Sequence, residues 1–180
     1  MGDDGIESGT GNATRGSDTG RVRYLLTLSR PRFWLYLAGP VVVGVAYGAR
    51  SVPALFAPPA LALFAYFLLP ANVFLYGVND AFDRDIDEHN PKKEEKEVRF
   101  RRDAVVGFVV TFTGALGALF LFVLPTAGVQ VLLLYFFLAV EYSAPPLRFK
   151  TTPFLDSLSN GLYALPGVIA FVAVADVLPP

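Results

Sequence analysis

Long apolar blocks separated by short polar segments dominate the chain after its first twenty residues. Five blocks reach or approach the roughly 20 mostly apolar residues that a helix needs to cross a bilayer. They cover residues 33–49, 54–78, 104–124, the stretch from the turn at 125–128 to about 143, and about 155–177. The pattern predicts an all-α, multi-span transmembrane helical bundle with about five spans.

Prolines interrupt the second block at Pro58, Pro59 and Pro70. Proline has no backbone N–H and its ring clashes with the preceding turn of a helix. We therefore expect this span to tilt or kink at these positions.

The N-terminal segment differs in composition from the rest of the chain. Residues 1–22 are rich in Gly, Ser, Thr and Asp, which predicts a disordered tail. They lack the basic start and apolar run of a signal peptide. We therefore divide the chain into this tail and a transmembrane domain over residues 23–180.

Basic residues are distributed unevenly over the two sides of the predicted bundle. Of 15 Lys and Arg residues, only Arg50 falls on one side. The others occupy the N-terminal arm and the loops after the second and fourth spans. Positive charge marks the cytoplasmic side, so we expect a multi-pass cell-membrane protein whose N-terminus and charged loops are cytoplasmic.

Composition excludes several kinds of metal site. The chain has no cysteine and one histidine, which rules out disulfides, thiolate sites and sites built from several imidazoles. Any metal site must therefore use oxygen ligands.

Oxygen ligands cluster at the end of the second span, in Asn79-Asp80-x-x-Asp83-x-x-x-Asp87. On a helix, Asp80, Asp83 and Asp87 share one face, where they would repel one another without a cation. Mg²⁺ favours a few carboxylates together with phosphate oxygens. We predict a Mg²⁺–pyrophosphate site here, with Asp80 and Asp83 catalytic.

Two other interpretations fit parts of this acidic segment. The first is a solvated helix end, and Asp85 fits it because this residue points off the shared face. The second is a calcium loop, which is disfavoured because Glu88 occupies the position that requires glycine.

A second polar segment, from Glu141 to Lys150, follows the fourth span. Pro145 and Pro146 end the helix and are expected to hold the next residues extended. Arg148 and Lys150 then point the same way and form a candidate phosphate clamp. Ordinary enrichment of cytoplasmic loops in basic residues is the alternative.

Polar residues also enter the predicted spans. Asn72 and Tyr76 continue the face of the aspartates, and Asp156, Asn160 and Tyr163 follow at i, i+4 and i+7 in the fifth span. We expect all five to line a substrate cavity, with interhelical hydrogen bonding as the alternative.

These motifs resemble those of a known family. The Asn79–Asp87 pattern looks like the first aspartate-rich motif of the UbiA-type intramembrane prenyltransferases and matches it at every position. Tyr142 to Lys150 (YSAPPLRFK) is similar to the loop after the fourth span in that family. The resemblance implies that Asn79, Arg148 and Lys150 bind a diphosphate, with Tyr142 near the reacting carbon.

The resemblance also implies a reaction. An isoprenyl group, for which dimethylallyl is expected, would leave an allylic diphosphate by Mg²⁺-dependent ionisation and join a lipophilic acceptor such as lycopene. The segments RPRFW (30–34) and LDSLSNG (155–161) look like the haloarchaeal carotenoid-elongating branch. Ether-lipid, quinone and chlorin prenylation are the alternatives. The expected partners are the donor, the acceptor and membrane lipid, and no nucleic acid.

The family has a larger bundle, with a second aspartate motif that this sequence lacks. The resemblance therefore covers the N-terminal portion of a UbiA-like bundle, incomplete at the C-terminus. We expect the 180-residue chain alone to be inactive or to need a partner, and an inactive membrane fragment remains an alternative. A lid over residues 92–102 is also expected.

Overall fold

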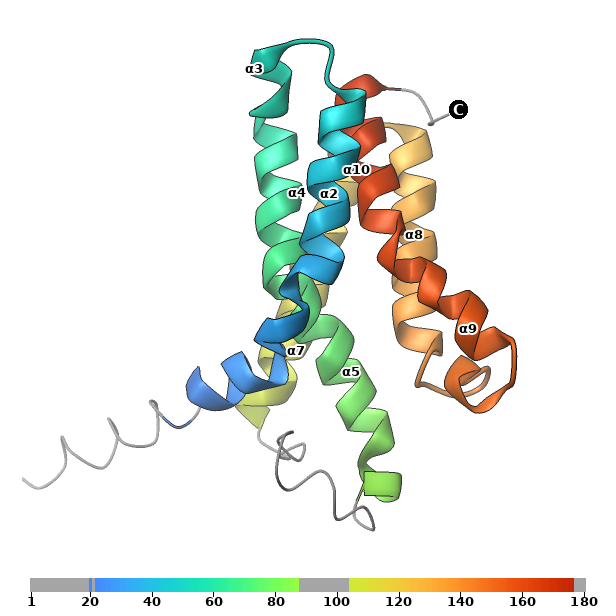
Figure 1. The fold of residues 1–180 in the computed structure, drawn as a ribbon. Helices are drawn as coiled ribbons and strands as arrows, with labels where there is room; N and C mark the ends of the chain where they lie inside the picture. Colours follow the sequence, from blue (N-terminus) through green and yellow to red (C-terminus); the bar gives the residue numbers. More distant parts are fainter. Residues whose placement is uncertain (1–19, 21, 88–103, 177–180) are drawn as a thin grey trace, which may run out of the picture.

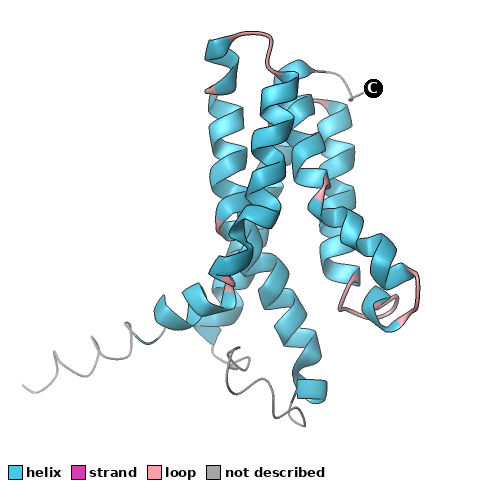
Figure 2. Ribbon diagram, viewed as in Figure 1, coloured by secondary structure: helices cyan, strands magenta, loops and turns pink. Residues whose placement is uncertain are grey.

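A computed structural model describes residue 20 and residues 22–87 and 104–176, with the backbone alone at 84–87. All regular structure in these ranges is helical (Figure 2), which confirms the predicted all-α bundle. The expected lid over residues 92–102 lies outside the described residues. So does the tail up to residue 19, whereas residues 22–28 form a helical segment.

The described helices follow the apolar blocks closely. In chain order they are η1 (Pro31–Phe33), α2 (Trp34–Gly48), α3 (Val52–Leu55), α4 (Pro58–Leu68), α5 (Pro70–Asp87), α7 (Ala104–Ala118), η2 (Leu119–Phe122), α8 (Thr126–Glu141), η3 (Phe149–Thr151), α9 (Leu155–Ser159), η4 (Asn160–Tyr163) and α10 (Leu165–Ala175).

Helical stretches over residues 52–83, 104–122 and 155–175 are long and apolar enough to cross a membrane, and Thr126–Glu141 is a shorter apolar helix. The fold is therefore that of a helical membrane bundle.

The prolines of the second block mark real breaks. Pro58 begins α4 and Pro70 begins α5, so the expected kinks are confirmed. Asn72 donates from Nδ2 to the carbonyls of Phe67 (2.9 Å) and Leu68 (3.0 Å). The buried amide thereby satisfies carbonyls that the break leaves without helical partners, as apolar surroundings require.

The fifth span is less regular than expected. Its first turns form α9, the chain then tightens into the 3₁₀ turn η4, and α10 follows with Pro166 in its first turn. The 3₁₀ turn has about 3.0 residues per turn instead of 3.6. It therefore changes which side chains share a face in this span.

Helix α10 packs chiefly against α2 and also against α8 and α4. At the α2–α10 contact, a Cβ built on Gly44 would lie 1.9 Å from the carbonyl oxygen of Gly167. The two backbones therefore touch directly, which only small residues permit.

The loops divide between two ends of the bundle (Figure 1). The segment 22–28, the end of α5 and the loop between α8 and α9 lie at one end, and the α2–α3 turn and the end of α10 lie at the other. The predicted carboxylate motif and the predicted basic loop therefore meet at the same end.

Candidate active site

The first carboxylate of the motif is paired with an arginine from the start of the chain. Arg30, which precedes η1, donates from a terminal guanidinium nitrogen to Asp80 Oδ1 at 3.0 Å. The Asp80 side chain is only 6% exposed. A carboxylate buried this far needs a charged or hydrogen-bonding partner, and Arg30 supplies one from an element 50 residues away.

Asn79 links helix α5 to the loop after α8. The Ser143 hydroxyl donates to Asn79 Oδ1 at 2.6 Å, and the Asn79 amide approaches Asp80 Oδ1 at 3.3 Å. Ser143 is fully buried. This short hydrogen bond fixes the orientation of the Asn79 amide and holds the basic loop against the carboxylate helix.

Asp83 faces that basic loop. Lys150 Nζ forms an ion pair with Asp83 Oδ1, and Arg148 lies 3.6 Å from the same oxygen. Arg148 also donates to the Phe82 carbonyl at 3.1 Å. In the described part of the site, three cations therefore surround two carboxylates. This cluster of Arg30, Arg148, Lys150, Asp80 and Asp83 is called the charged mouth below.

The basic loop is folded, so the expectation of an extended segment is wrong. The Arg148 N–H donates to the Ala144 carbonyl (3.0 Å), and the Lys150 N–H donates to the Tyr142 carbonyl (3.2 Å). Arg148 adopts a left-handed conformation with φ 41°. Both basic side chains nevertheless reach Asp83, because the turn closes back on the end of α8.

Burial lowers the pKa of the Lys150 ammonium from 10.5, and the charge of Asp80 acts in the opposite direction. The carboxylates thus help to keep this half-buried lysine charged.

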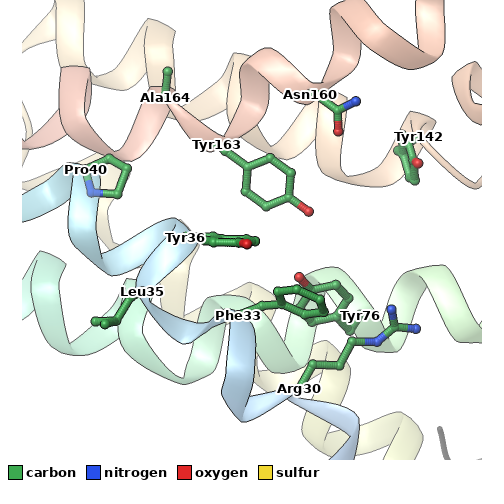
Figure 3. Close-up of a pocket in the computed structure, with 10 residues that line it drawn as sticks. All are labelled: Arg30, Phe33, Leu35, Tyr36, Pro40, Tyr76, Tyr142, Asn160, Tyr163 and Ala164. Atoms are coloured by element: carbon green, nitrogen blue, oxygen red, sulfur yellow. The ribbon is translucent and has the colours of Figure 1, made fainter. Parts of the chain in front are cut away.

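A cavity of about 740 Å³ opens beside the Arg30–Asp80 pair. It is lined by Arg30, Phe33, Leu35, Tyr36, Pro40, Tyr76, Tyr142, Asn160, Tyr163 and Ala164 (Figure 3). Its volume falls within the roughly 300–1,000 Å³ usual for small-molecule sites. Pro40 and Ala164 lie at one end, and Arg30 and Tyr142 lie at the other.

Aromatic rings form most of the wall. The ring of Phe33 lies 5.2 Å from that of Tyr36 and 6.1 Å from that of Tyr76, and Tyr36 meets Tyr163 edge-on at 6.2 Å. The Arg30 guanidinium carbon sits 4.6 Å from the centre of the Tyr76 ring. The wall is therefore apolar but rich in electrons, and such rings attract cations.

The structure brings most of the expected cavity residues together. Tyr76, Asn160 and Tyr163 line the cavity, and so does Tyr142. Asn160 and Tyr163 share a side because η4 spaces them one 3₁₀ turn apart. Two expected residues do not line it, since Asn72 is buried at the α4–α5 break and Asp156 instead accepts a hydrogen bond from the Tyr142 hydroxyl at 3.1 Å.

Sequence reasoning missed Arg30 as a candidate site residue, together with Phe33 and Tyr36. In the sequence, Arg30 belongs to the basic N-terminal arm and to the RPRFW segment, and neither pattern assigned it a role in the site. Its position three residues before the aromatic Phe33, at the mouth of the first span, was the available signal.

Burial raises the pKa of the Tyr142 phenol to about 12, and the hydrogen bond to Asp156 adds to the shift. The phenol is therefore neutral at physiological pH, with its proton directed to the carboxylate.

No group of three His, Cys, Asp or Glu side chains forms a metal site within the described residues. The side chain of Asp87, the third predicted Mg²⁺ ligand, lies outside them. The described carboxylates of the predicted metal site, Asp80 and Asp83, offer oxygen atoms at the charged end of the bundle. Two carboxylates suit an ion that takes its other ligands from phosphate and water.

The described residues thus combine a helical membrane bundle with an aromatic cavity and, beside it, a cluster of ion pairs at one end of the bundle. Comparison with known families then identifies the class: residues 37–180 match the UbiA prenyltransferase family. The chain belongs to this family and is a membrane protein, so the resemblance seen in the sequence is confirmed.

The curated relatives that the chain matches include three lycopene elongase/hydratases. The chain is 65% identical over 158 residues to a lycopene elongase/hydratase of Haloarcula japonica, covering 87% of this chain and 54% of that protein. It is 59% identical over 177 residues to a lycopene elongase/hydratase of Haloferax volcanii (97% and 59%). A Corynebacterium glutamicum lycopene elongase/hydratase is 31% identical over 147 residues (79% and 50%).

The chain thus spans about half the length of these curated relatives. No solved structure matches it.

Proposed function

We propose that the cavity beside Arg30 and Asp80 binds an allylic diphosphate, with dimethylallyl diphosphate as the first candidate, and transfers its isoprenyl group to a lipophilic acceptor such as lycopene. The observation that carries the proposal is the adjacency of two unlike environments. A cluster of partly buried ion pairs adjoins an aromatic cavity, and Arg30 belongs to both.

The charged mouth suits the diphosphate. Arg30, Arg148 and Lys150 outnumber Asp80 and Asp83, the carboxylates with which they form ion pairs, by one charge. Arginine binds phosphate oxygens through a planar fork and lysine as a point charge. Asn79, fixed by Ser143, can add an amide donor. On binding, the basic side chains would exchange part of their contact with Asp80 and Asp83 for contact with the diphosphate.

The carboxylates suit a magnesium ion bound together with that diphosphate. Asp80, Asp83 and the predicted Asp87 would hold the ion through oxygen, with its remaining positions taken by phosphate and water. Bound there, Mg²⁺ would supply charge neutralisation to the leaving diphosphate.

The aromatic wall suits the organic half of the donor. When the allylic C–O bond breaks, its electron pair leaves with the diphosphate and an allylic cation remains. The ring faces of Phe33, Tyr36 and Tyr76 can stabilise that cation by cation–π contact. The same rings exclude water, which would otherwise capture the cation and yield an alcohol.

A second cavity supports a long apolar acceptor. It has about 760 Å³, runs along α2 and α10, and is lined among others by Val43, Gly44 and Phe171. It shares Pro40 and Ala164 with the first cavity, at the end away from Arg30. A polyene lying in this groove would present its end to the aromatic cavity.

The proposed orientation follows the basic loops. Arg30, Arg148 and Lys150 belong to the end of the bundle where the charged loops gather, and Arg50 follows α2 at the other end. Under the positive-inside rule the charged mouth faces the cytoplasm, where Mg²⁺ and soluble diphosphates are available.

Transfer is tested by incubating membranes that contain the chain with lycopene and labelled dimethylallyl, geranyl or geranylgeranyl diphosphate. The 180-residue chain and a chimera, in which it replaces the matched part of the Haloarcula japonica relative, are assayed side by side. We expect Mg²⁺-dependent diphosphate release and an elongated carotenoid from the chimera, and little or no product from the short chain.

Two results would count against the proposal. One is the absence of Mg²⁺-dependent binding of any isoprenyl diphosphate by either protein. The other is transfer that continues unchanged after EDTA treatment. Prenylation of a quinone, chlorin or glycerol lipid in place of lycopene would keep the chemistry and change the acceptor.

A further inference from the structure

The reaction proposed above releases a proton. When the double bond of the acceptor attacks the allylic cation, a new C–C bond forms and the positive charge moves to an acceptor carbon. That carbon then either loses a neighbouring C–H proton to form a double bond or adds water, whose O–H proton departs. Both outcomes release one proton beside the largely aromatic wall of the cavity.

The described carboxylates near the cavity differ in what they contact. Asp80 and Asp83 form ion pairs with basic side chains and are the carboxylates assigned above to the metal ion. Asp156 Oδ1 instead accepts a hydrogen bond from the neutral phenol of Tyr142. Asp156 is thus connected to the cavity through Tyr142, a group that lines the cavity and can carry a proton.

The surroundings hold Asp156 in place. Its backbone carbonyl accepts hydrogen bonds from the Ser159 hydroxyl (2.8 Å) and from Asn160 Nδ2 (3.0 Å). The Asp156 N–H donates to the Thr152 carbonyl (3.1 Å). Because the O–H of Tyr142 is directed to this fixed carboxylate, the lone pairs of the phenol oxygen remain available to the cavity that Tyr142 lines.

We propose that Tyr142 and Asp156 form the proton outlet of this site. The proton leaving the acceptor carbon or the added water binds the Tyr142 oxygen while the proton of Tyr142 passes to the Asp156 carboxylate. The electron pair of a broken C–H bond becomes the second bond of the new C=C, whereas the electron pair of a broken O–H bond stays on the oxygen as a lone pair. Tyr142 touches the reacting atoms, and Asp156 is a positioning residue that acts through it. The inference rests on the proposed function.

The test separates ionisation of the donor from completion of transfer. In the chimera, Asp156→Asn keeps the size of the side chain and removes its basicity. We expect product formation to fall about tenfold or more, as for loss of a general base. The KM for dimethylallyl diphosphate should stay unchanged, and diphosphate release should continue with prenyl alcohol as the by-product.

Tyr142→Phe should give the same uncoupling of diphosphate release from carotenoid formation, and Asp156→Glu should restore part of the transfer. Ser157→Ala, an exposed neighbour on α9, is the matched control. Binding of the donor shows whether each variant is folded. If Asp156→Asn does not fold, Tyr142→Phe alone tests the proposal.

Unchanged product formation in folded Asp156→Asn and Tyr142→Phe overturns the proton outlet while leaving the proposed function intact. An equal fall in diphosphate release and in transfer also overturns it, since the pair would then act before proton loss. An unmodified chimera that neither releases diphosphate nor forms product overturns both.

Discussion

Arg30 and Asp80, 50 positions apart in sequence, form a part-buried ion pair of 3.0 Å at the edge of an aromatic cavity. The arginine ends the segment before the first span, and the aspartate belongs to the carboxylate face of α5. Since the Arg30 guanidinium also lies over the Tyr76 ring, one side chain joins the charged mouth to the apolar wall.

Removal of the charge on Asp80 should weaken donor binding. Asp80→Asn leaves Arg30 without its carboxylate and removes one proposed Mg²⁺ ligand. A hydrogen bond to a charged group contributes about 1.5–3 kcal/mol, so we expect Mg²⁺-dependent affinity for dimethylallyl diphosphate to fall about 10- to 100-fold. Equilibrium binding of labelled donor to membranes measures this.

Asp176→Asn is the control for that substitution. Asp176 is an exposed carboxylate with positive φ at the opposite end of the bundle, and asparagine tolerates that conformation. Affinity that stays the same in Asp80→Asn, or falls equally in both variants, would contradict a site at the mouth.

A bulky side chain in the groove along α2 should impair transfer to the acceptor without weakening donor binding. Val43→Trp places a large ring in the second cavity, where we expect the polyene to lie. Overpacking costs about 1–3 kcal/mol, so transfer to lycopene should fall roughly tenfold while donor affinity remains. The measurement is the ratio of carotenoid product to bound donor.

Val42→Trp provides the comparison, because Val42 has nearly the same exposure (53% against 56%) but lines a different cavity on the same helix. A similar loss of transfer in the two variants would argue against an acceptor groove between α2 and α10.

The glycine contact between α2 and α10 should govern stability. Gly44→Ala places a Cβ 1.9 Å from the Gly167 carbonyl oxygen, which the two backbones can accommodate only by moving apart. We expect a loss of about 1–3 kcal/mol or more, seen as a lower thermal transition in detergent by circular dichroism. Gly39→Ala in the same helix, where a Cβ meets nothing within 4 Å, should leave the transition unchanged.

The pH dependence should show that Tyr142 acts as a neutral phenol. Its pKa is raised to about 12, so the protonated form is favoured in the folded protein. The stabilisation that this provides is complete below pH 10 and is lost as the pH rises towards 12. The transfer rate of the unmodified chimera divided by that of Tyr142→Phe should therefore stay constant between pH 7 and pH 10. A ratio that halves near pH 10 would indicate an unperturbed phenol.

Periodicity and proline positions were sufficient to predict the helices and the breaks in the second span, since both follow from local backbone chemistry. The carboxylate face was predictable for the same reason, because Asp80 and Asp83 are one turn apart. The ion pair between Asp80 and Arg30 was not predictable in this way. Arg30 reaches Asp80 through tertiary packing, which no local pattern reports.

The basic loop shows a different limit. Prolines predicted the end of α8 but not the compact turn that follows, because that turn depends on long-range contacts such as Ser143 with Asn79. Asn72 shows a third limit. Its polarity indicated a cavity, whereas the α4–α5 break uses its amide, and sequence spacing does not distinguish the two uses.

The backbone contact between Gly44 and Gly167 also constrains biogenesis. The first span leaves the ribosome long before α10, so the face of α2 that holds Gly44 must wait in the translocon or in lipid until α10 has been synthesised. Closure of this part of the bundle is therefore a late, post-insertion event, and a nascent chain stalled before residue 167 should expose that face to crosslinking.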